Sequence, residues 1–443
     1  MRLLSYISAM LISGLAISSA HAATELEFWH SMDGARGEAL VEVTDRFNAA
    51  QKDYKVVPVY KGSYEETAGT GLAATQAGKG PHILQVYDLG TANMITARQA
   101  YRPTHQVLSD AGEKLGADAY APAASSYYSD ERGNLMGLPF NVSTPVMFYN
   151  RTLFLKAGLD PNKPLTTWYD VQAALLKLQE AGSRCGLTTT WPSWTLVENT
   201  LAWHSEEFAT RNNGFDGPDA QLSFNTRLAI RHISLLSSWL KSGIYTHAGR
   251  RDEGEALFLK GDCGMLMTSS ASYANLKRNA NFDFGLMLMP YYDDINKAPY
   301  NTSTGGAGLW AMAGKKPAEY RGVGEFFAYL AKAETQAIWH QRTGYLPLSR
   351  AAYDLTLKSG FYDAFPGVDV SIKQVVNVGK PTAYSRGVRL GNQAAIRSIL
   401  DEELENVWAL VKAPKQGLDD AVRRGNEVLR RFERGHKLTA SSN

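Results

Sequence analysis

The fold of this chain is decided by the stretch Tyr300-Asn-Thr-Ser-Thr-Gly-Gly-Ala-Gly-Leu-Trp-Ala-Met-Ala-Gly314. Its glycines precede the apolar run Leu309–Met312, and glycine lets a backbone approach a ligand or another strand closely. The apolar periodicity after it predicts a helix over residues 317–341, beginning with Pro317, whose missing N–H costs nothing in a first turn. The stretch is therefore typical of a strand-and-helix unit in an α/β protein.

The first residues have the pattern of a secretory signal peptide, which we predict over residues 1–23. Arg2 supplies a positive charge, the run that ends near Ile17 is mostly apolar, and Ala20-His21-Ala22 fits an A-x-A cleavage site. The apolar run is too short, and too often interrupted by serine, for a membrane anchor. We therefore expect an exported protein, located in the periplasm if the host is Gram-negative.

Length and charge limit the classes of partner. A chain of 443 residues exceeds what one hydrophobic core usually serves, so we expect two lobes. The formal net charge is only +2, which argues against nucleic acid or an anionic membrane as the main partner.

The two cysteines, Cys185 and Cys263, leave two interpretations open. In an oxidising compartment they can pair as a disulfide, and the alternative is a pair of buried free thiols. Two cysteines without a further ligand pair do not make a metal site, so we expect neither a metal nor a cofactor.

The early part of the chain alternates strands with helices. Strands are predicted over residues 26–30, 54–60 and 82–87, with helices between them. This order favours a largely parallel sheet, and ligands bind beyond the carboxyl ends of the strands in such sheets. Tyr64, at a predicted helix start, and Asp88, at a predicted strand end, both lie in that location.

The rival class is a secreted hydrolase. A phosphodiesterase or phosphatase needs a metal cluster or a paired nucleophile and base, but the histidines are not spaced as metal ligands and no G-x-S-x-G motif occurs. A glycosidase with two catalytic carboxylates stays open as an alternative. We expect a binding protein without catalytic residues.

The order of short motifs along the whole mature chain resembles that of the extracellular solute-binding proteins of ABC importers, the family that includes maltose-binding protein. The motifs are Leu26-Glu-Phe-Trp-His30, Tyr149-Asn-Arg-Thr-Leu-Phe154, Pro164-Leu-Thr-Thr-Trp168 and Gly344-Tyr-Leu-Pro347. The glycerol-3-phosphate-binding branch of that family is more similar still. Its motifs are Phe28-Trp-His-Ser-Met32, Ile83-Leu-Gln-Val-Tyr87, Asn212-Asn-Gly-Phe-Asp216 and Arg389-Leu-Gly-Asn392.

The resemblance implies a periplasmic-binding-protein-like α/β fold. Two lobes are joined by a hinge with several crossovers, and the ligand lies in the cleft between them. We expect residues 24–140 and 300–345 in the N-terminal lobe, and residues 141–299 and 346–443 in the C-terminal lobe. The resemblance also implies a monomer that delivers its ligand to an inner-membrane permease with a cytoplasmic ATPase.

The resemblance further implies a set of nine ligand-binding residues. They are Tyr64, Asp88, Ser143, Trp191, Trp194, Ser269, Gly306, Tyr345 and Arg397. Arg397 matches the phosphate arginine, and its planar guanidinium suits a phosphate. Asp88 stands where close relatives have glutamate, and its carboxylate would accept hydrogen bonds from glycerol hydroxyls. The residues taken alone allow ordinary roles too, such as a helix cap for Asp88.

The implied ligand is sn-glycerol 3-phosphate or a glycerophosphodiester such as glycerophosphocholine. Trp191 and Trp194 resemble the aromatic wall of the pocket, and an aromatic pair suits glycerol carbons, a choline head or a sugar face. A neutral sugar therefore stays open as an alternative ligand.

Overall fold

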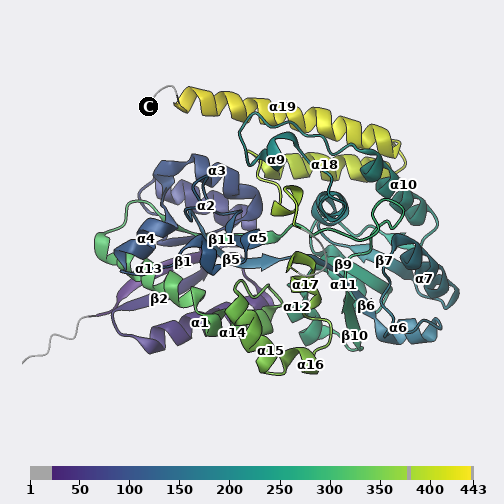
Figure 1. The fold of residues 1–443 in the computed structure, drawn as a ribbon, viewed down its shortest axis with the longest axis horizontal. Coiled ribbons are helices and arrows are strands. Elements are labelled where there is room, and N and C mark those ends of the chain that lie inside the picture. The colour runs from purple at the N-terminus through teal and green to yellow at the C-terminus, as the bar shows by residue number, and fades with distance from the viewer. Residues whose placement is uncertain (1–21, 377–380, 441–443) are drawn as a thin grey trace, which may run out of the picture.

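The computed structural model describes residues 22–376 and 381–440, and two β-sheets organise them (Figure 1). The first sheet has the order β2-β1-β3-β11-β4, and β5 also pairs with β11. Its strands are β1 (Thr24–His30), β2 (Tyr54–Tyr60), β3 (Ile83–Tyr87), β4 (Tyr101–Arg102), β5 (Leu138–Ser143) and β11 (Gly305–Met312). The second sheet has the order β10-β6-β9-β7-β8. Its strands are β6 (Pro145–Asn150), β7 (Cys185–Thr189), β8 (Tyr245–Thr246), β9 (Cys263–Ser269) and β10 (Phe284–Met287).

The prediction of a largely parallel sheet is confirmed for strand direction, although each sheet contains one opposed strand among those described: β11 in the first sheet and β6 in the second. Strand β1 runs parallel to β2 and β3, as expected for strands joined by helices. Strand β11 runs antiparallel to β3 and β5, because the chain enters it from the second sheet rather than from a crossover helix. The stretch Tyr300–Gly314 thus inserts a returning strand between segments from the first part of the chain.

Two chain segments connect the sheets near their centre. Strands β5 and β6 are separated by Thr144 alone, so the chain passes directly from the first sheet to the second. Residues 288–304 then lead from β10 back to β11. In the second sheet, a disulfide joins Cys185 to Cys263, which are directly paired residues of β7 and β9.

Helices cover each sheet and bury its apolar side chains. Around the first sheet lie α1 (Gly34–Ala50), α2 (Tyr64–Gln76), α3 (Thr91–Thr96), α4 (Thr104–Asp110), α5 (Pro122–Ser125), α13 (Pro317–Ala331) and α14 (Ala333–Thr343). Phe28, Trp310 and Phe326 are fully buried in the core that these helices share with the sheet.

The remaining helices belong to the second sheet or to its border with the first. They are α6 (Arg151–Lys156), α7 (Trp168–Glu180), α8 (Asn199–Trp203), α9 (Thr210–Gly214), α10 (Arg227–Lys241), α11 (Glu253–Leu259), α12 (Ser272–Asn279), α15 (Arg350–Lys358), α16 (Phe361–Ala364), α17 (Val370–Val376), α18 (Gln393–Trp408) and α19 (Pro414–Ala440). The segment α9 has positive φ values at Arg211, Asn212 and Asn213, so it is a left-handed turn.

Where one helix was predicted over residues 317–341, the structure has two. The backbone of Lys332 is extended, with φ −61° and ψ 139°, and separates α13 from α14. Helix α13 packs on β1 and α4, whereas α14 packs on α1 and α15, so the break lets consecutive helices cover different surfaces.

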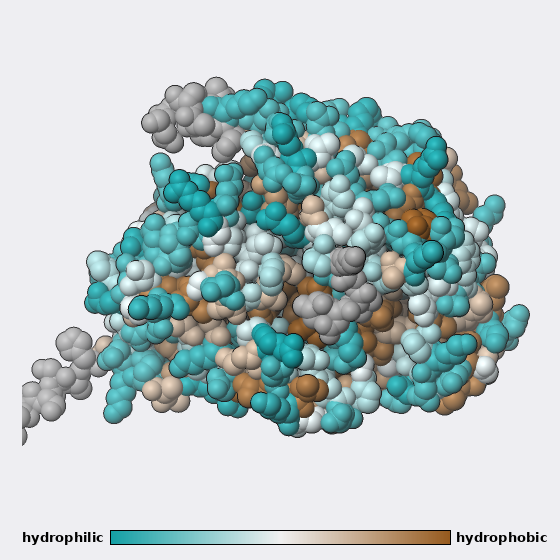
Figure 2. Space-filling view, viewed as in Figure 1, coloured by the Kyte–Doolittle hydropathy of each residue, from teal (hydrophilic) through white to brown (hydrophobic). Residues whose placement is uncertain are grey.

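The last helix, α19, lies along one edge of the molecule over α18 (Figure 1). On the face shown in Figure 2, hydrophobic residues form small groups separated by hydrophilic ones. Among the described residues, no helix combines the length and the apolar character needed to cross a membrane.

Candidate functional site

One cavity between the two sheets brings together all nine residues predicted to bind the ligand. It measures about 70 Å³, which is small beside the roughly 300–1,000 Å³ usual for sites that hold drug-sized molecules. Three further residues, Arg36, Tyr87 and Gly305, line it as well. The sequence interpretation did not assign these three to the site.

Strand ends supply the hydroxyl groups of the site. Ser143 is the last residue of β5 and Ser269 is the last residue of β9, so each lies where its strand leaves the sheet. Because Thr144 alone separates β5 from β6, and β6 pairs with β9, the two serines meet. Ser269 donates a 2.8 Å hydrogen bond to the Ser143 hydroxyl.

Two helix N-termini also face the cavity. Tyr64 is the first residue of α2, at the predicted helix start, and a capping box between Ser63 and Glu66 closes that end of the helix. Arg36 lies in the first turn of α1. Helix N-termini carry partial positive charge and favour anions nearby. The Tyr64 ring stacks on Tyr87 at 5.5 Å between ring centroids, which fixes its direction.

The glycines of the anchoring stretch permit a close backbone approach. Gly306 has φ +116°, and a Cβ atom there would lie 1.9 Å from the carbonyl oxygen of Asn141. A Cβ atom at Gly305 would meet the indole of Trp194 at 2.9 Å. The buried indole N–H of Trp194 has no hydrogen-bond partner among the described residues, so a ligand atom in this cavity can serve as its acceptor.

One end of the site carries a buried cluster of charges. Arg397, near the start of α18, donates two 2.7 Å hydrogen bonds to the carboxylate of Glu198. It also contacts Asp88 at 3.3 Å. Burial raises the pKa of Asp88 to about 6, with Glu198 adding to this effect and Arg397 opposing it. Two carboxylates therefore already surround the guanidinium that was expected to hold a phosphate.

A second guanidinium, that of Arg36, lies in the same cavity. It contacts Asp33 at 2.7 Å and, more distantly, Asp252 at 3.9 Å. Burial lowers the pKa of Arg36, but its acidic neighbours Asp252 and Asp33 oppose this effect and the pKa is raised overall. The side chain is therefore a permanent cation beside two tyrosine hydroxyls.

The aromatic wall comes from the segment after β7. Trp191 has a left-handed backbone with φ 49°, and Trp194 follows in a π-helical turn over Ser193–Glu198. Arg251 lies 5.5 Å from the centroid of the Trp191 ring and forms a 2.8 Å ion pair with Glu65 of α2. This pair links the segment after β8 to a helix of the first sheet across the cavity.

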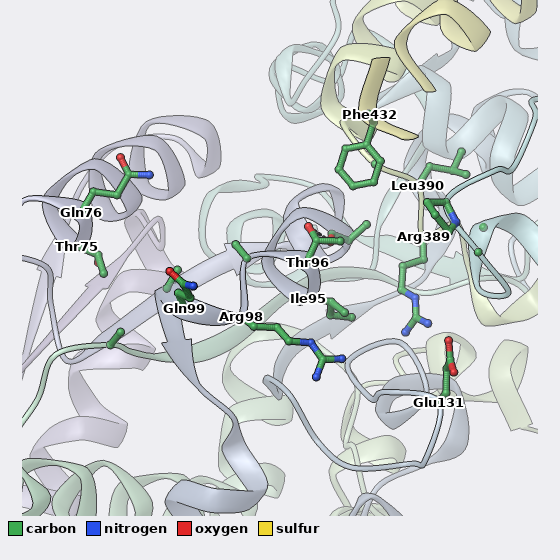
Figure 3. A pocket seen from close by; sticks show the side chains of 18 of the residues that line it. Thr75, Gln76, Ile95, Thr96, Arg98, Gln99, Glu131, Arg389, Leu390 and Phe432 are labelled. Atoms are coloured by element: carbon green, nitrogen blue, oxygen red, sulfur yellow. Dashed lines mark hydrogen bonds between the residues drawn. The ribbon is translucent and has the colours of Figure 1, made fainter. Parts of the chain in front are cut away.

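A larger crevice of about 1,000 Å³ lies elsewhere, between α2 and α3 on one side and α19 with the residues before α18 on the other (Figure 3). Arg98, Glu131 and Arg389 point into it from different elements. It shares no lining residue with the smaller cavity, and the guanidinium of Arg389 is held by the carbonyl oxygens of Ser129 and Phe215. The smaller cavity is the better candidate because it collects hydroxyl, indole and guanidinium donors in one place.

The chain belongs to the bacterial extracellular solute-binding protein family, whose model matches residues 42–366. It is 48% identical over 421 residues to the sn-glycerol-3-phosphate-binding periplasmic protein UgpB of Yersinia pestis, with 95% of each chain covered. The UgpB protein of Escherichia coli O1:K1 is 46% identical over 439 residues, which cover 99% of this chain and 100% of that protein.

Solved structures show the same fold. UgpB of Mycobacterium tuberculosis, solved in complex with glycerophosphocholine, superposes with a TM-score of 0.78 at 20% identity and covers 93% of this chain and 99% of its own. The maltodextrin-binding MalE domain of Bdellovibrio bacteriovorus, bound to maltotriose, gives a TM-score of 0.71 at 18% identity, covering 92% of this chain and 100% of its own. The predicted family and the two-lobed, periplasmic-binding-protein-like α/β fold are confirmed. The predicted signal peptide falls almost entirely outside the described residues.

Two charged residues of the site were missed for different reasons. Arg36 follows a strand that ends at His30, so the rule that ligands bind beyond strand ends also points to it. Glu198 lies within the turn after Trp194 and carries no sequence signal of its own.

Proposed function

We propose that this protein is the periplasmic substrate-binding component of an ABC importer, and that it captures sn-glycerol 3-phosphate or a glycerophosphodiester. It then delivers the ligand to an inner-membrane permease with a cytoplasmic ATPase. The observation that carries the proposal is one small cavity where two serine hydroxyls, two tyrosine hydroxyls, an indole N–H and two guanidinium groups converge. Relatives of nearly the same length that are 46–48% identical and named for glycerol-3-phosphate binding support it.

The donors suit a phosphorylated polyol. Charge-assisted hydrogen bonds to a phosphate contribute about 1.5–3 kcal/mol each, so a few of them hold a small anion firmly. Asp88 can accept hydrogen bonds from glycerol hydroxyls, and Trp191 and Trp194 can cover the glycerol carbons. The Asp88 carboxylate is shorter than the glutamate expected from relatives, and its contact with Arg397 fixes its position.

A neutral sugar is the second candidate ligand. The tryptophans suit a sugar face, and the structural relatives include a protein bound to maltotriose. The cavity of about 70 Å³ favours a compact ligand over an oligosaccharide. We further propose that the protein acts as a monomer. We also propose that it binds its ligand without turnover, as membership of a solute-binding family suggests.

Isothermal titration of the mature protein with glycerol 3-phosphate, glycerophosphocholine and maltose tests the proposal. We expect one-to-one binding of a phosphate ligand and complete recovery of that ligand after incubation. Binding of maltose but of neither phosphate ligand would show that the ligand is a neutral sugar. Hydrolysis of glycerophosphocholine or of a glycoside would show that the protein is an enzyme rather than a binding protein.

A further inference from the structure

We propose that Arg36 is the residue that holds the phosphate, and that it makes the site prefer a phosphate monoester to a diester. This inference rests on the proposed function, because it assigns one end of the same cavity to the charged part of the ligand. It also assigns Arg397 a different role from the phosphate contact expected from the sequence.

The donors of Arg397 are already engaged. Its Nε and Nη2 atoms both bond to Glu198, whose side chain is only 3% exposed, and Nη2 also contacts Asp88. One guanidinium between two ionised carboxylates gives this cluster a net negative charge. A phosphate dianion placed there would face two buried carboxylates, whose repulsion little water screens.

The carboxylates that pair with Arg36 compete less strongly with a phosphate than those that pair with Arg397. Its partners Asp33 and Asp252 have side chains that are 58% and 47% exposed, so water screens both charges. Only Nη2 of Arg36 has a hydrogen-bond acceptor among the described residues, the carboxylate of Asp33. The remaining N–H groups of a planar guanidinium suit the oxygens of a phosphate.

The neutral groups near Arg36 are also donors. Tyr64 and Tyr345 line the same cavity as Arg36, and their phenol groups can donate hydrogen bonds to a ligand there. Arg36 and Tyr64 belong to the first turns of two helices, whose positive ends add to the field at this end of the site. The phosphate therefore lies toward Arg36, and the hydroxyls of the ligand lie toward Asp88.

The charge of the ligand then decides selectivity. A phosphate monoester carries about −1.5 to −2 charges at pH 7 because its second pKa is about 6, whereas a diester carries a single charge. The attraction to Arg36 scales with that charge. The site should thus bind glycerol 3-phosphate more tightly than glycerophosphocholine, and Arg36 should account for most of the difference.

The test is titration of wild-type and Arg36→Gln proteins with both ligands. Losing hydrogen bonds to a charged group should weaken glycerol 3-phosphate binding about ten- to a hundred-fold. The loss for glycerophosphocholine should be smaller, and Arg36→Lys should restore much of the affinity for the monoester. Circular dichroism and thermal unfolding check that each variant is folded.

Two matched variants separate phosphate binding from contact between the lobes. Arg278→Gln removes an arginine that pairs with Glu38 of α1 at 2.9 Å outside the cavity, and Asp252→Asn removes the distant partner of Arg36. Neither should weaken binding of the monoester. An equal loss for both ligands in Arg36→Gln and Asp252→Asn would overturn the proposal in favour of a lobe contact.

The remaining outcomes distinguish the two proposals. Unchanged binding in Arg36→Gln with lost binding in Arg397→Gln would place the phosphate on Arg397, and would leave the proposed function standing. Absence of any phosphate-ligand binding by the wild-type protein would overturn the proposed function and this inference together.

Discussion

The guanidinium of Arg397 and the carboxylate of Glu198 form a bidentate ion pair, with both N–H···O distances at 2.7 Å, beside the proposed ligand site. Both side chains are buried, at 11% and 3% exposed. Removing one partner of a buried ion pair lowers stability more than removing one partner of an exposed pair, because the remaining charge stays buried without a partner.

Replacing Glu198 by alanine should therefore lower the free energy of unfolding by about 3–5 kcal/mol. Urea unfolding measures this change. The control is Glu427→Ala, which removes the carboxylate partner of Arg423 in a 3.5 Å surface pair and should change stability by less than about 1 kcal/mol. Equal effects of the two substitutions would contradict the assigned burial.

The raised pKa of Asp88 predicts a specific pH dependence. Its pKa is about 6 in the folded protein and near its ordinary value of 3.8 when unfolded, so the folded state binds the proton more tightly. This contribution to stability is complete below pH 3.8 and is lost as pH rises through 6.

Asp88→Asn should remove this dependence. From pH 4 to pH 7 the variant should gain stability relative to wild type by up to about 3 kcal/mol, since each pKa unit is worth about 1.4 kcal/mol. Urea unfolding at several pH values gives the comparison. A stability difference that does not vary with pH would show that Asp88 titrates as an ordinary carboxyl group.

Gly306 tolerates no side chain in this backbone. Gly306→Ala should destabilise the protein by more than the roughly 1 kcal/mol of a left-handed residue, because the new Cβ atom meets the Asn141 carbonyl oxygen at 1.9 Å. It should also weaken ligand binding. The matched control is Gly314→Ala, with φ +80° and no atom within 4 Å of a built Cβ, which isolates the backbone cost. Thermal unfolding and titration report both effects.

The disulfide between Cys185 and Cys263 should stabilise the fold. The two residues are 78 positions apart, and a loop of that size corresponds to about 4 kcal/mol in the chain-entropy model. Urea unfolding with and without a reductant, compared with the double alanine variant, measures the contribution of the disulfide to the free energy of unfolding. Equal stability of the oxidised and reduced protein would show that the bond adds nothing.

The ion pair between Arg251 and Glu65 should influence binding only modestly. Its side chains are 47% and 36% exposed, and exposed pairs contribute less than about 1 kcal/mol. Glu65→Arg should weaken ligand binding a few-fold at low salt, and the charge swap with Arg251→Glu should restore it. If high salt leaves the effect of Glu65→Arg unchanged, electrostatic attraction is not its cause.

Local patterns predicted the early elements well. The strand ends near His30 and Tyr87 and the helix start at Tyr64 agree with the structure, because each depends on nearby residues. The break at Lys332 was missed because no glycine or proline marks it. Tertiary packing of α13 and α14 on different surfaces decides it. The antiparallel pairing of β11 depends likewise on a return from the second sheet.

The sequence predicted which residues line the site more fully than it predicted how their charges pair. The residues taken from the family resemblance all line one cavity, but the resemblance did not reveal that Glu198 neutralises Arg397. Such a pairing joins residues 199 positions apart, and periodicity carries no information about it. Arg36 was not singled out from the sequence, although the end of β1 places it near the cavity.

The single residue Thr144 between β5 and β6 has a mechanical consequence. Ser143 directly precedes this crossing and Ser269 hydrogen-bonds to it, so a rotation of one sheet against the other that bent the chain at Thr144 would displace these serines little. Trp191 and Arg251 belong to the segments after β7 and β8, further from Thr144 along the second sheet. A ligand that contacts both the serines and Trp191 in this cavity would therefore hold the two sheets in one relative orientation.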